Sequence, residues 1–145
     1  MSDLFDRILL LKKSELFSEV TTEDLRVVAQ ELVEEVCFRG ERVFDIGDPS
    51  DKMCIIEQGR IGISIKENPR VQEYIVELGA GQCFGEMGML DDQPRSATAH
   101  VIEDTTLLAL DKLILKALLT NYPELGLGIM RSLSLRLREA NLKLK

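Results

Sequence analysis

Turn-forming residues recur through the middle of this chain at intervals of about eight to twelve residues, which is the spacing of an antiparallel all-β domain. The short runs between them are rich in β-branched and aromatic residues, and the run at 61–65 alternates isoleucine with small residues, as a strand with one buried face does. The pattern predicts an antiparallel sandwich or jelly-roll barrel. The expected strands are 36–38, 43–44, 53–56, 61–65, 71–78, 97–101 and 105–110, with turns at 39–41, 47–49, 58–59 and 67–69.

Helical patterns flank this region on both sides. Residues 3–13 and 22–32 place apolar side chains three and four positions apart, with Thr21 or Thr22 as the N-cap of the second helix. The segments 113–119 and 123–145 show the same periodicity. We therefore expect a mainly β fold with flanking helices. It would be a single domain over 1–145, divided into N-terminal helices (1–33), an antiparallel β-roll (34–110) and C-terminal helices (111–145).

The apolar residues of the last helix fall in two stripes. Leu127, Leu135 and Leu142 lie on one side. Residues on the other side step by four and three in alternation, as in the seam of a coiled coil. One stripe would cover the β-roll and the other would need a second partner, unless the end of the helix is apolar without a partner. The expected homodimer seam is formed by Met130, Leu133, Leu137 and Leu144.

Composition excludes several classes of partner. A net charge of −7 at pH 7 argues against the basic face that nucleic-acid binding needs, so we expect no direct DNA binding. No apolar run approaches the roughly 20 residues of a membrane helix, and no signal-peptide pattern opens the sequence. Cys37, Cys54 and Cys83 are odd in number and lack metal-ligand spacing. We expect buried, reduced thiols and a cytoplasmic location.

Glycines, an acid and a base lie close together in residues 81–99, which we call the cradle. Gly85 and Gly88 flank Glu86, and glycine lets backbone approach a ligand closely because it has no Cβ. A short helix that begins near Glu86 would direct N–H groups at an anion. Arg95 could close on the same anion with its planar fork of donors. The cradle therefore indicates a site for one phosphate, with Glu86 available for a neighbouring hydroxyl. The alternative is an ordinary loop salt bridge.

The order of these parts resembles the cyclic nucleotide-binding domain, the sensor module of the bacterial catabolite activator family, of cyclic-nucleotide-dependent kinases and of gated channels. The resemblance extends over about 10–142. It implies a β-roll with a C-terminal helical lid, and a sensor rather than an enzyme. Gly88 stands where many members have alanine, a departure expected to be harmless. The resemblance rests mainly on Phe84-Gly85-Glu86-Met87-Gly88-Met89-Leu90 and Pro94-Arg95-Ser96-Ala97-Thr98, with turn glycines at Gly47, Gly59 and Gly81.

The resemblance also implies roles for single residues. Glu86 matches the acid that accepts from the ribose 2′-hydroxyl, and Arg95 matches the base that pairs with the cyclic phosphate. Ser96, in place of the threonine common in cGMP-selective sites, favours cAMP, and Asn141 is a candidate partner for the adenine amino group. The remaining ligand-binding residues would be Phe84, Gly85, Met87, Gly88 and Ala97 in the cradle, with Ile63, Ile75 and Val76 as apolar walls beside the base.

We therefore expect a cyclic nucleotide-binding regulatory module that couples ligand occupancy to movement of its C-terminal helices, with no cofactor or metal besides cAMP or cGMP. One alternative is a protein-interaction or dimerisation module that no longer binds nucleotide. A cupin-type enzyme would need several histidines for its metal, and the chain has one, His100. No helix-turn-helix pattern follows in the sequence before Lys145, so we expect a sensor module without a DNA-binding domain. The output domain or protein is unknown.

Overall fold

The computed structural model describes residues 2–65 and 74–144. It divides into two compact units, of which residues 33–112 form the β unit, whereas residues 1–32 and 113–145 form the helical unit. The predicted turn at 67–69 and the first residues of the predicted strand 71–78 lie outside the described part. The fold class predicted from the sequence, a mainly antiparallel β-roll with helices at both ends, is confirmed.

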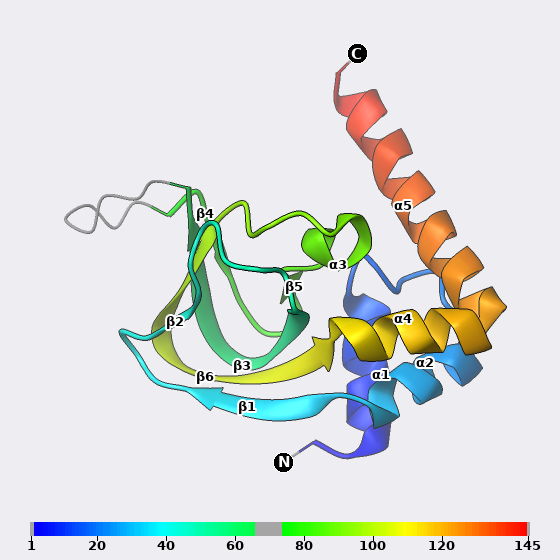
Figure 1. Ribbon diagram of the computed structural model, residues 1–145, viewed down its shortest axis with the longest axis horizontal. Helices are drawn as coiled ribbons and strands as arrows, with labels where there is room; N and C mark the ends of the chain where they lie inside the picture. The colour runs from blue at the N-terminus through cyan, green and yellow to red at the C-terminus, as the bar shows by residue number, and fades with distance from the viewer. Residues whose placement is uncertain (1, 66–73, 145) are drawn as a thin grey trace. The chain divides into compact units, whose positions relative to one another are not determined.

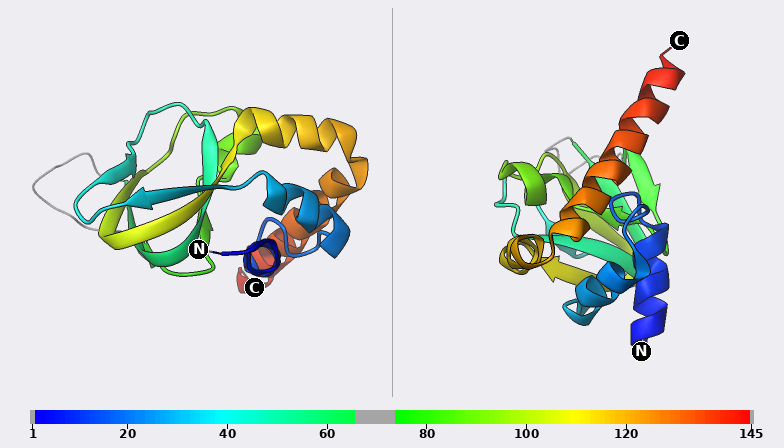
Figure 2. Two further views of the ribbon diagram at one scale, coloured as in Figure 1. Left: turned by 90° about the horizontal axis from the view of Figure 1, so that it is seen from below. Right: turned by 90° about the vertical axis from the view of Figure 1, so that its right-hand side faces the viewer.

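The β unit contains one antiparallel sheet (Figure 1). Its strands run in the order β1-β6-β3-β4, while β2 pairs with β6 and β5 pairs with β3. Two long curved strands, β3 and β6, form the middle of the sheet, as Figures 1 and 2 show. In the described residues the strands are β1 (Val33–Cys37), β2 (Arg42–Phe44), β3 (Lys52–Ser64), β4 (Val76–Leu78), β5 (Cys83–Phe84) and β6 (Thr98–Asp111).

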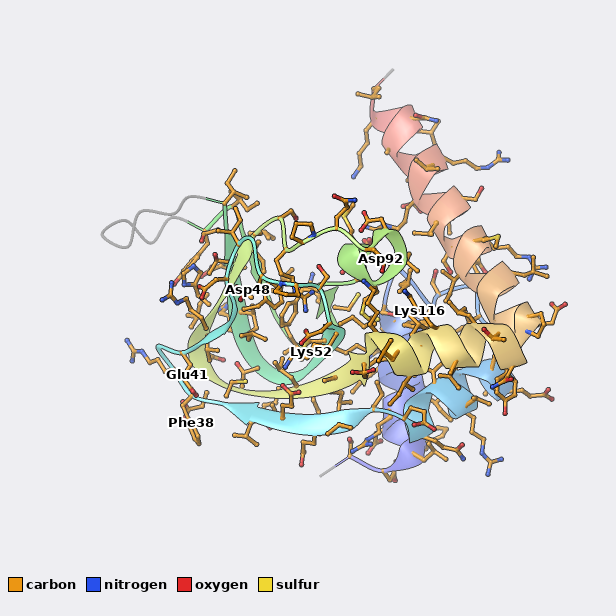
Figure 3. The ribbon with its side chains drawn as sticks, viewed as in Figure 1. Phe38, Glu41, Asp48, Lys52, Asp92 and Lys116 are labelled. Carbon is orange, nitrogen blue, oxygen red and sulfur yellow. The ribbon has the colours of Figure 1, made fainter. Side chains whose placement is uncertain are left out.

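One predicted turn separates two strands of the structure, whereas another lies inside a continuous strand. The turn at 39–41 separates β1 from β2, and there the Phe38 N–H donates to the Glu41 carboxylate (Figure 3). The predicted turn at 58–59 is wrong, because β3 runs through it. Gly59 has φ +116°, and the pairing of β3 with β6 shifts register on both sides of it. It therefore forms a bulge, which bends a strand without ending it.

The same correction applies to β6. The strands predicted at 97–101 and 105–110 are one strand, with its exposed residues Glu103 and Asp104 near the register shifts. The face that β3 and β6 bury together forms the core of the β unit, and burial raises the pKa of the Cys54 thiol there to about 12. The buried core residues are Cys54, Ile56, Ile61, Phe84, Ala99, Val101, Leu107 and Ala109.

The helical unit begins with two capped helices. Asp3 accepts from the Asp6 N–H at the start of α1 (Leu4–Lys13), and the Thr21 side chain accepts from the Asp24 N–H at the start of α2 (Thr22–Gln30). These contacts satisfy N–H groups that the first turn of a helix leaves without a partner. Toward the C-terminus, α4 (Lys112–Asn121) is followed by α5 (Pro123–Lys143). Among the helices described, none is long and apolar enough to cross a membrane.

The buried side of α5 is neither of the two stripes predicted for it. Leu125, Gly128, Ile129 and Ser132 are buried, whereas Leu127 and the other leucines of its predicted stripe are exposed. Two small residues explain the difference. Gly128 packs against Val20, and the Ser132 hydroxyl accepts from the Glu19 N–H at 3.0 Å. A periodic pattern of large apolar residues does not identify a contact that glycine and serine make.

Gly128→Ala is expected to destabilise the protein by about 1–2 kcal/mol, although alanine in a helix is normally about 1 kcal/mol better than glycine. The new Cβ would lie 2.9 Å from Val20 Cγ2 and 3.0 Å from Val20 Cα, so backbone would have to move. Gly126→Ala is the matched control in the same helix, because its Cβ would meet only Leu119 Cδ2, at 3.6 Å. Urea denaturation measures both variants. Equal stabilisation of the two would contradict the close contact at Val20.

Candidate functional site

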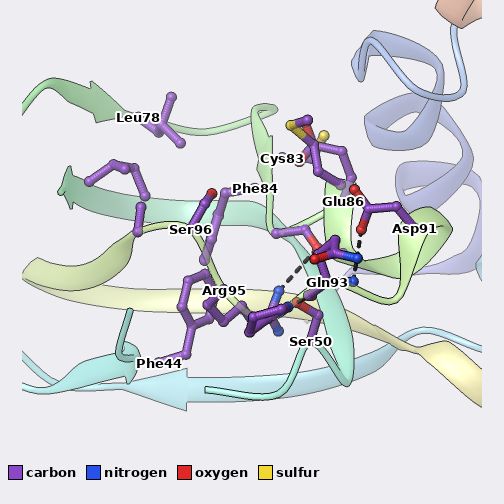
Figure 4. Close-up of a pocket in the computed structure, with 16 residues that line it drawn as sticks. Phe44, Ser50, Leu78, Cys83, Phe84, Glu86, Asp91, Gln93, Arg95 and Ser96 are labelled. Atoms are coloured by element: carbon purple, nitrogen blue, oxygen red, sulfur yellow. Dashed lines mark hydrogen bonds between the residues drawn. The ribbon is translucent and has the colours of Figure 1, made fainter. Parts of the chain in front are cut away.

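A cavity of about 310 Å³ lies in the β unit, bounded by the cradle on one side and by the sheet on the other (Figure 4). This volume is at the lower end of the range for small-molecule sites. All eight cradle residues predicted to bind ligand line it, as does Ile63 on β3. The lining residues are Phe44, Ser50, Ile63, Leu78, Cys83, Phe84, Gly85, Glu86, Met87, Gly88, Asp91, Gln93, Pro94, Arg95, Ser96 and Ala97.

Within the cradle, the backbone at Gly85 has a conformation that favours glycine. Gly85 has φ +78°, and a Cβ on it would lie 2.6 Å from Arg95 Nη1. The absence of a side chain therefore lets the guanidinium reach the backbone at this point. Directly after Glu86, as predicted, a short helix begins, α3 (Met87–Asp91). The helix is followed by the C-cap residue Asp92, which has φ +58°.

Backbone carbonyls hold the Arg95 guanidinium in place within the cradle. Its side chain is only 3% exposed. Nη1 donates to the Gly85 carbonyl at 3.1 Å, and Nη2 donates to the Lys52 carbonyl at 2.6 Å. The guanidinium stacks on the Phe44 ring, with Cζ 3.9 Å from the ring centroid. Figure 4 shows Arg95 and Phe44 close together at the cavity. Such contacts fix both the position and the plane of the guanidinium.

One donor of Arg95 is left over. Its Nε is buried and has no hydrogen-bond partner among the residues that the structure describes. Burial lowers the pKa of Arg95, while Cys54, Asp51 and Asp48 act in the opposite direction. The guanidinium nevertheless stays charged, because arginine is not deprotonated in proteins. A buried donor on a cation is costly unless an acceptor is supplied. Because Arg95 also lines the cavity, an anion bound there would lie beside a buried cation.

The loop between β2 and β3 contacts both the backbone and the side chain of Arg95. The Arg95 N–H donates to the Asp48 carbonyl at 2.7 Å, and the Gly47 N–H donates to the Arg95 carbonyl at 2.8 Å. The Asp51 carboxylate is 3.5 Å from Nη2. Figure 3 marks Asp48 on this loop and Lys52 at the start of β3. Backbone and side chain of Arg95 are thus both anchored to residues about 45 positions earlier in the chain.

Two predicted ligand-binding residues of the β unit are not brought to the cavity, and a third belongs to the other unit. Ile75 and Val76 are 62% and 43% exposed and do not belong to the described lining. Ile75 lies just before β4, outside the strand, and its N–H donates to the Ile63 carbonyl at 2.7 Å. Val76 shares the face of Leu78 but begins β4. Asn141 belongs to the helical unit, where it is exposed near the end of α5.

Sequence reasoning missed seven residues of the lining. Cys83, Asp91, Gln93 and Pro94 lie inside the cradle, so proximity in sequence could have found them. Leu78 ends a predicted strand and could have been chosen in place of Ile75. Phe44 and Ser50 carry no signal of their own, because only the fold brings the segment before β3 to the cradle. The missed residues are Phe44, Ser50, Leu78, Cys83, Asp91, Gln93 and Pro94.

Comparisons with known proteins agree on one family. The family model described as the cyclic nucleotide-binding domain matches residues 35–122. The chain is 31% identical over 134 residues to the cyclic AMP receptor protein of Thermus thermophilus, covering 92% of this chain. It is 30% identical over 107 residues, 74% of its length, to the cAMP-dependent protein kinase regulatory subunit of Eremothecium gossypii.

Among solved structures, the N-terminal domain of a transcriptional regulator from Streptomyces coelicolor A3(2) has a TM-score of 0.81 with this chain at 26% identity. The match covers 91% of this chain and 94% of that one. The chain spans 62% of the length of the Thermus receptor protein and 22% of the length of the kinase subunit.

Proposed function

Because this chain belongs to the family of cyclic nucleotide-binding domains, we propose that it binds a cyclic nucleotide, cAMP in preference to cGMP, in the cavity of the β unit. The observation that carries the proposal is the buried Arg95, which lines this cavity and whose Nε lacks a partner in the described chain. A cyclic phosphodiester carries one negative charge, and one buried arginine balances it. The relatives that are named for cAMP support the choice of ligand.

The phosphate and the ribose of the ligand would contact different residues of the cradle. Arg95 would pair with the cyclic phosphate, aided by backbone N–H groups of Gly85, Met87 and Gly88 on one side and of Ser96 and Ala97 on the other. Glu86 would accept from the ribose 2′-hydroxyl. Each hydrogen bond to a charged group contributes about 1.5–3 kcal/mol, so a few of them support micromolar binding after the costs of ordering.

The base would lie against the apolar part of the lining. Ile63 and Leu78 come from paired strands and both line the cavity, so they are the wall that we propose in place of Ile75 and Val76. Ser96 supports a preference for cAMP, because the threonine common in cGMP-selective sites is absent. Asn141 remains a proposed contact to the adenine amino group, supported only by its place on the last helix.

Occupancy of the cradle would move the C-terminal helices from residue 111 onward. The support is a contact within the β unit, where the Lys112 N–H donates to the Asp51 carbonyl at 2.9 Å and the Lys112 ammonium pairs with Asp92. Lys112 begins α4, and Asp51 also approaches Arg95. A hundredfold difference in affinity between two states of the helices would correspond to about 2.7 kcal/mol, which is enough to shift such an equilibrium.

Calorimetric titration with cAMP and with cGMP tests the proposal. We expect micromolar binding of cAMP and weaker binding of cGMP. Adenosine 5′-monophosphate is the matched control, because it keeps the base and ribose but carries an open phosphate. Absence of heat at millimolar cAMP would refute the proposed ligand. A titration in which the two cyclic nucleotides bind equally would refute only the preference.

A second candidate is a protein-interaction or dimerisation module, and the exposure of Met130 and Leu137 on α5 and of Leu144 at its C-cap favours it. We place a homodimer contact at these residues together with Leu133. A stable dimer whose cradle gives no response to cyclic nucleotide would support this function over the first. Both candidates act in the cytoplasm, a location that the three free cysteines support.

A further inference from the structure

Gly88 and Ser50 occupy the same small space at the cavity wall. A Cβ on Gly88 would lie 2.0 Å from Ser50 Oγ, 2.2 Å from Ser50 Cβ and 2.9 Å from the Gln93 carbonyl oxygen. Atoms at these separations overlap, so alanine at position 88 requires Ser50 to move. Many family members have alanine where this chain has Gly88, and the sequence predicts that this departure is harmless. In the structure, however, the choice of residue at position 88 depends on Ser50, which lies 38 positions earlier.

Ser50 is buried and makes a contact of its own across the cradle. Its hydroxyl donates to the Gln93 carbonyl at 2.6 Å. The Gln93 N–H in turn donates to Asp91 Oδ1 at 3.0 Å, at the end of α3 (Figure 4). The loop that carries Ser50 also holds the Arg95 backbone through Asp48. Ser50 is thus placed between the start of the cradle helix and the loop before β6 that carries the arginine.

We propose that Ser50 is a positioning residue of the binding site, which sets the distance between α3 and Arg95 by filling the space beside Gly88 and by bonding to Gln93. This inference rests on the proposed function. Ser50 acts through the cradle backbone: α3 offers its first N–H groups to the ligand and Arg95 offers the guanidinium, and both must reach one phosphate. A shift of α3 away from Ser50 separates these two sets of donors.

A double-mutant cycle on the full chain tests the pairing, with cAMP as the ligand in calorimetric titration. Gly88→Ala is expected to raise the Kd about tenfold, because overpacking displaces α3. Ser50→Ala, which removes only the hydrogen bond, is expected to raise it about threefold. In Gly88→Ala/Ser50→Gly the two shortest overlaps, both with Ser50, are removed and only the 2.9 Å approach to the Gln93 carbonyl remains, so the Kd should return to within about threefold of Ser50→Gly alone. Gly79→Ala is the control, since a Cβ there meets nothing within 4 Å.

Thermal unfolding of the same variants without ligand accompanies the titrations and shows that each is folded. Rescue of affinity in the double variant supports the inference, because loss of stability alone predicts additive effects. Wild-type affinity in Gly88→Ala, or additive losses in the double variant, would overturn the positioning role while leaving the proposed function intact. If the wild type itself binds no cyclic nucleotide, the proposed function fails and the role of Ser50 in binding falls with it.

Discussion

Arg95→Ala is expected to weaken cAMP binding at least tenfold. Arg95 is the buried cation of the cavity, and it is the residue whose Nε lacks a partner among the described residues. Loss of one hydrogen bond to a charged group costs about 1.5–3 kcal/mol, and about 1.4 kcal/mol is a factor of ten in Kd. Calorimetric titration of the variant against the wild type gives the ratio directly.

The alanine variant also loses contacts within the protein, because Arg95 donates to the Gly85 and Lys52 carbonyls and stacks on Phe44. Arg95→Lys separates the two effects. Lysine keeps the charge and the stem but not the planar fork, so an intermediate affinity is expected. Arg42→Ala is the matched control, since its side chain is exposed and pairs with Asp45. A folded Arg95→Ala protein with unchanged affinity would show that the cavity does not bind the phosphate.

Gly59→Ala is expected to destabilise the β unit by about 3–5 kcal/mol, the sum of backbone strain and overlap. At φ +116° alanine is strained, and its Cβ would lie 2.3 Å from Thr105 Oγ1 and 2.6 Å from Thr105 Cα. Thr105 is buried and its hydroxyl accepts from the Arg60 N–H, so it has no space to retreat into. Urea denaturation would detect such a loss readily, since whole domains are stable by only about 5–15 kcal/mol.

Two further glycines in the β unit divide this cost into its parts. Gly40 has φ +92° but open space around its Cβ position, so Gly40→Ala reports backbone strain alone. Gly79 has neither feature, and Gly79→Ala should leave the unfolding free energy within about 0.5 kcal/mol of the wild type. Equal effects at positions 40 and 59 would mean that β3 and β6 do not approach each other closely at the bulge.

Much of the fold followed from local patterns. The helices α1 and α2, an N-cap at Thr21 or Thr22 and most of the antiparallel strand segments were predicted, although β5 was not, because hydrophobic periodicity and turn chemistry act within a few residues. Strand continuity was not predictable in the same way. Residues 58–59 have the composition of a turn, but pairing with β6 keeps the strand extended through them. Long-range pairing outweighs a local turn preference there.

In the candidate site too, residues close together in sequence were predicted better than residues that only the fold brings together. The cradle residues from Phe84 to Gly88 and from Arg95 to Ala97 were chosen from the sequence, and the structure lines one cavity with all of them. The walls were predicted less well. Ile63 lines the cavity, but Leu78 stands there in place of Ile75 and Val76, since alternation along a strand identifies a face and not the position of a cavity.

The sequence by itself determined the chemistry of this protein: a β-roll and a cradle in which glycines flank Glu86 and an arginine, Arg95, follows. Those features depend on residue types at short spacing, and short spacing is readable along a chain. Only the tertiary structure decided that Arg95 lies buried on Phe44, that Ser50 fills the place of a Cβ at Gly88, and that Gly128 rather than a leucine packs against Val20. Each of these contacts joins residues far apart in sequence, and its energy depends on distances that no local pattern encodes.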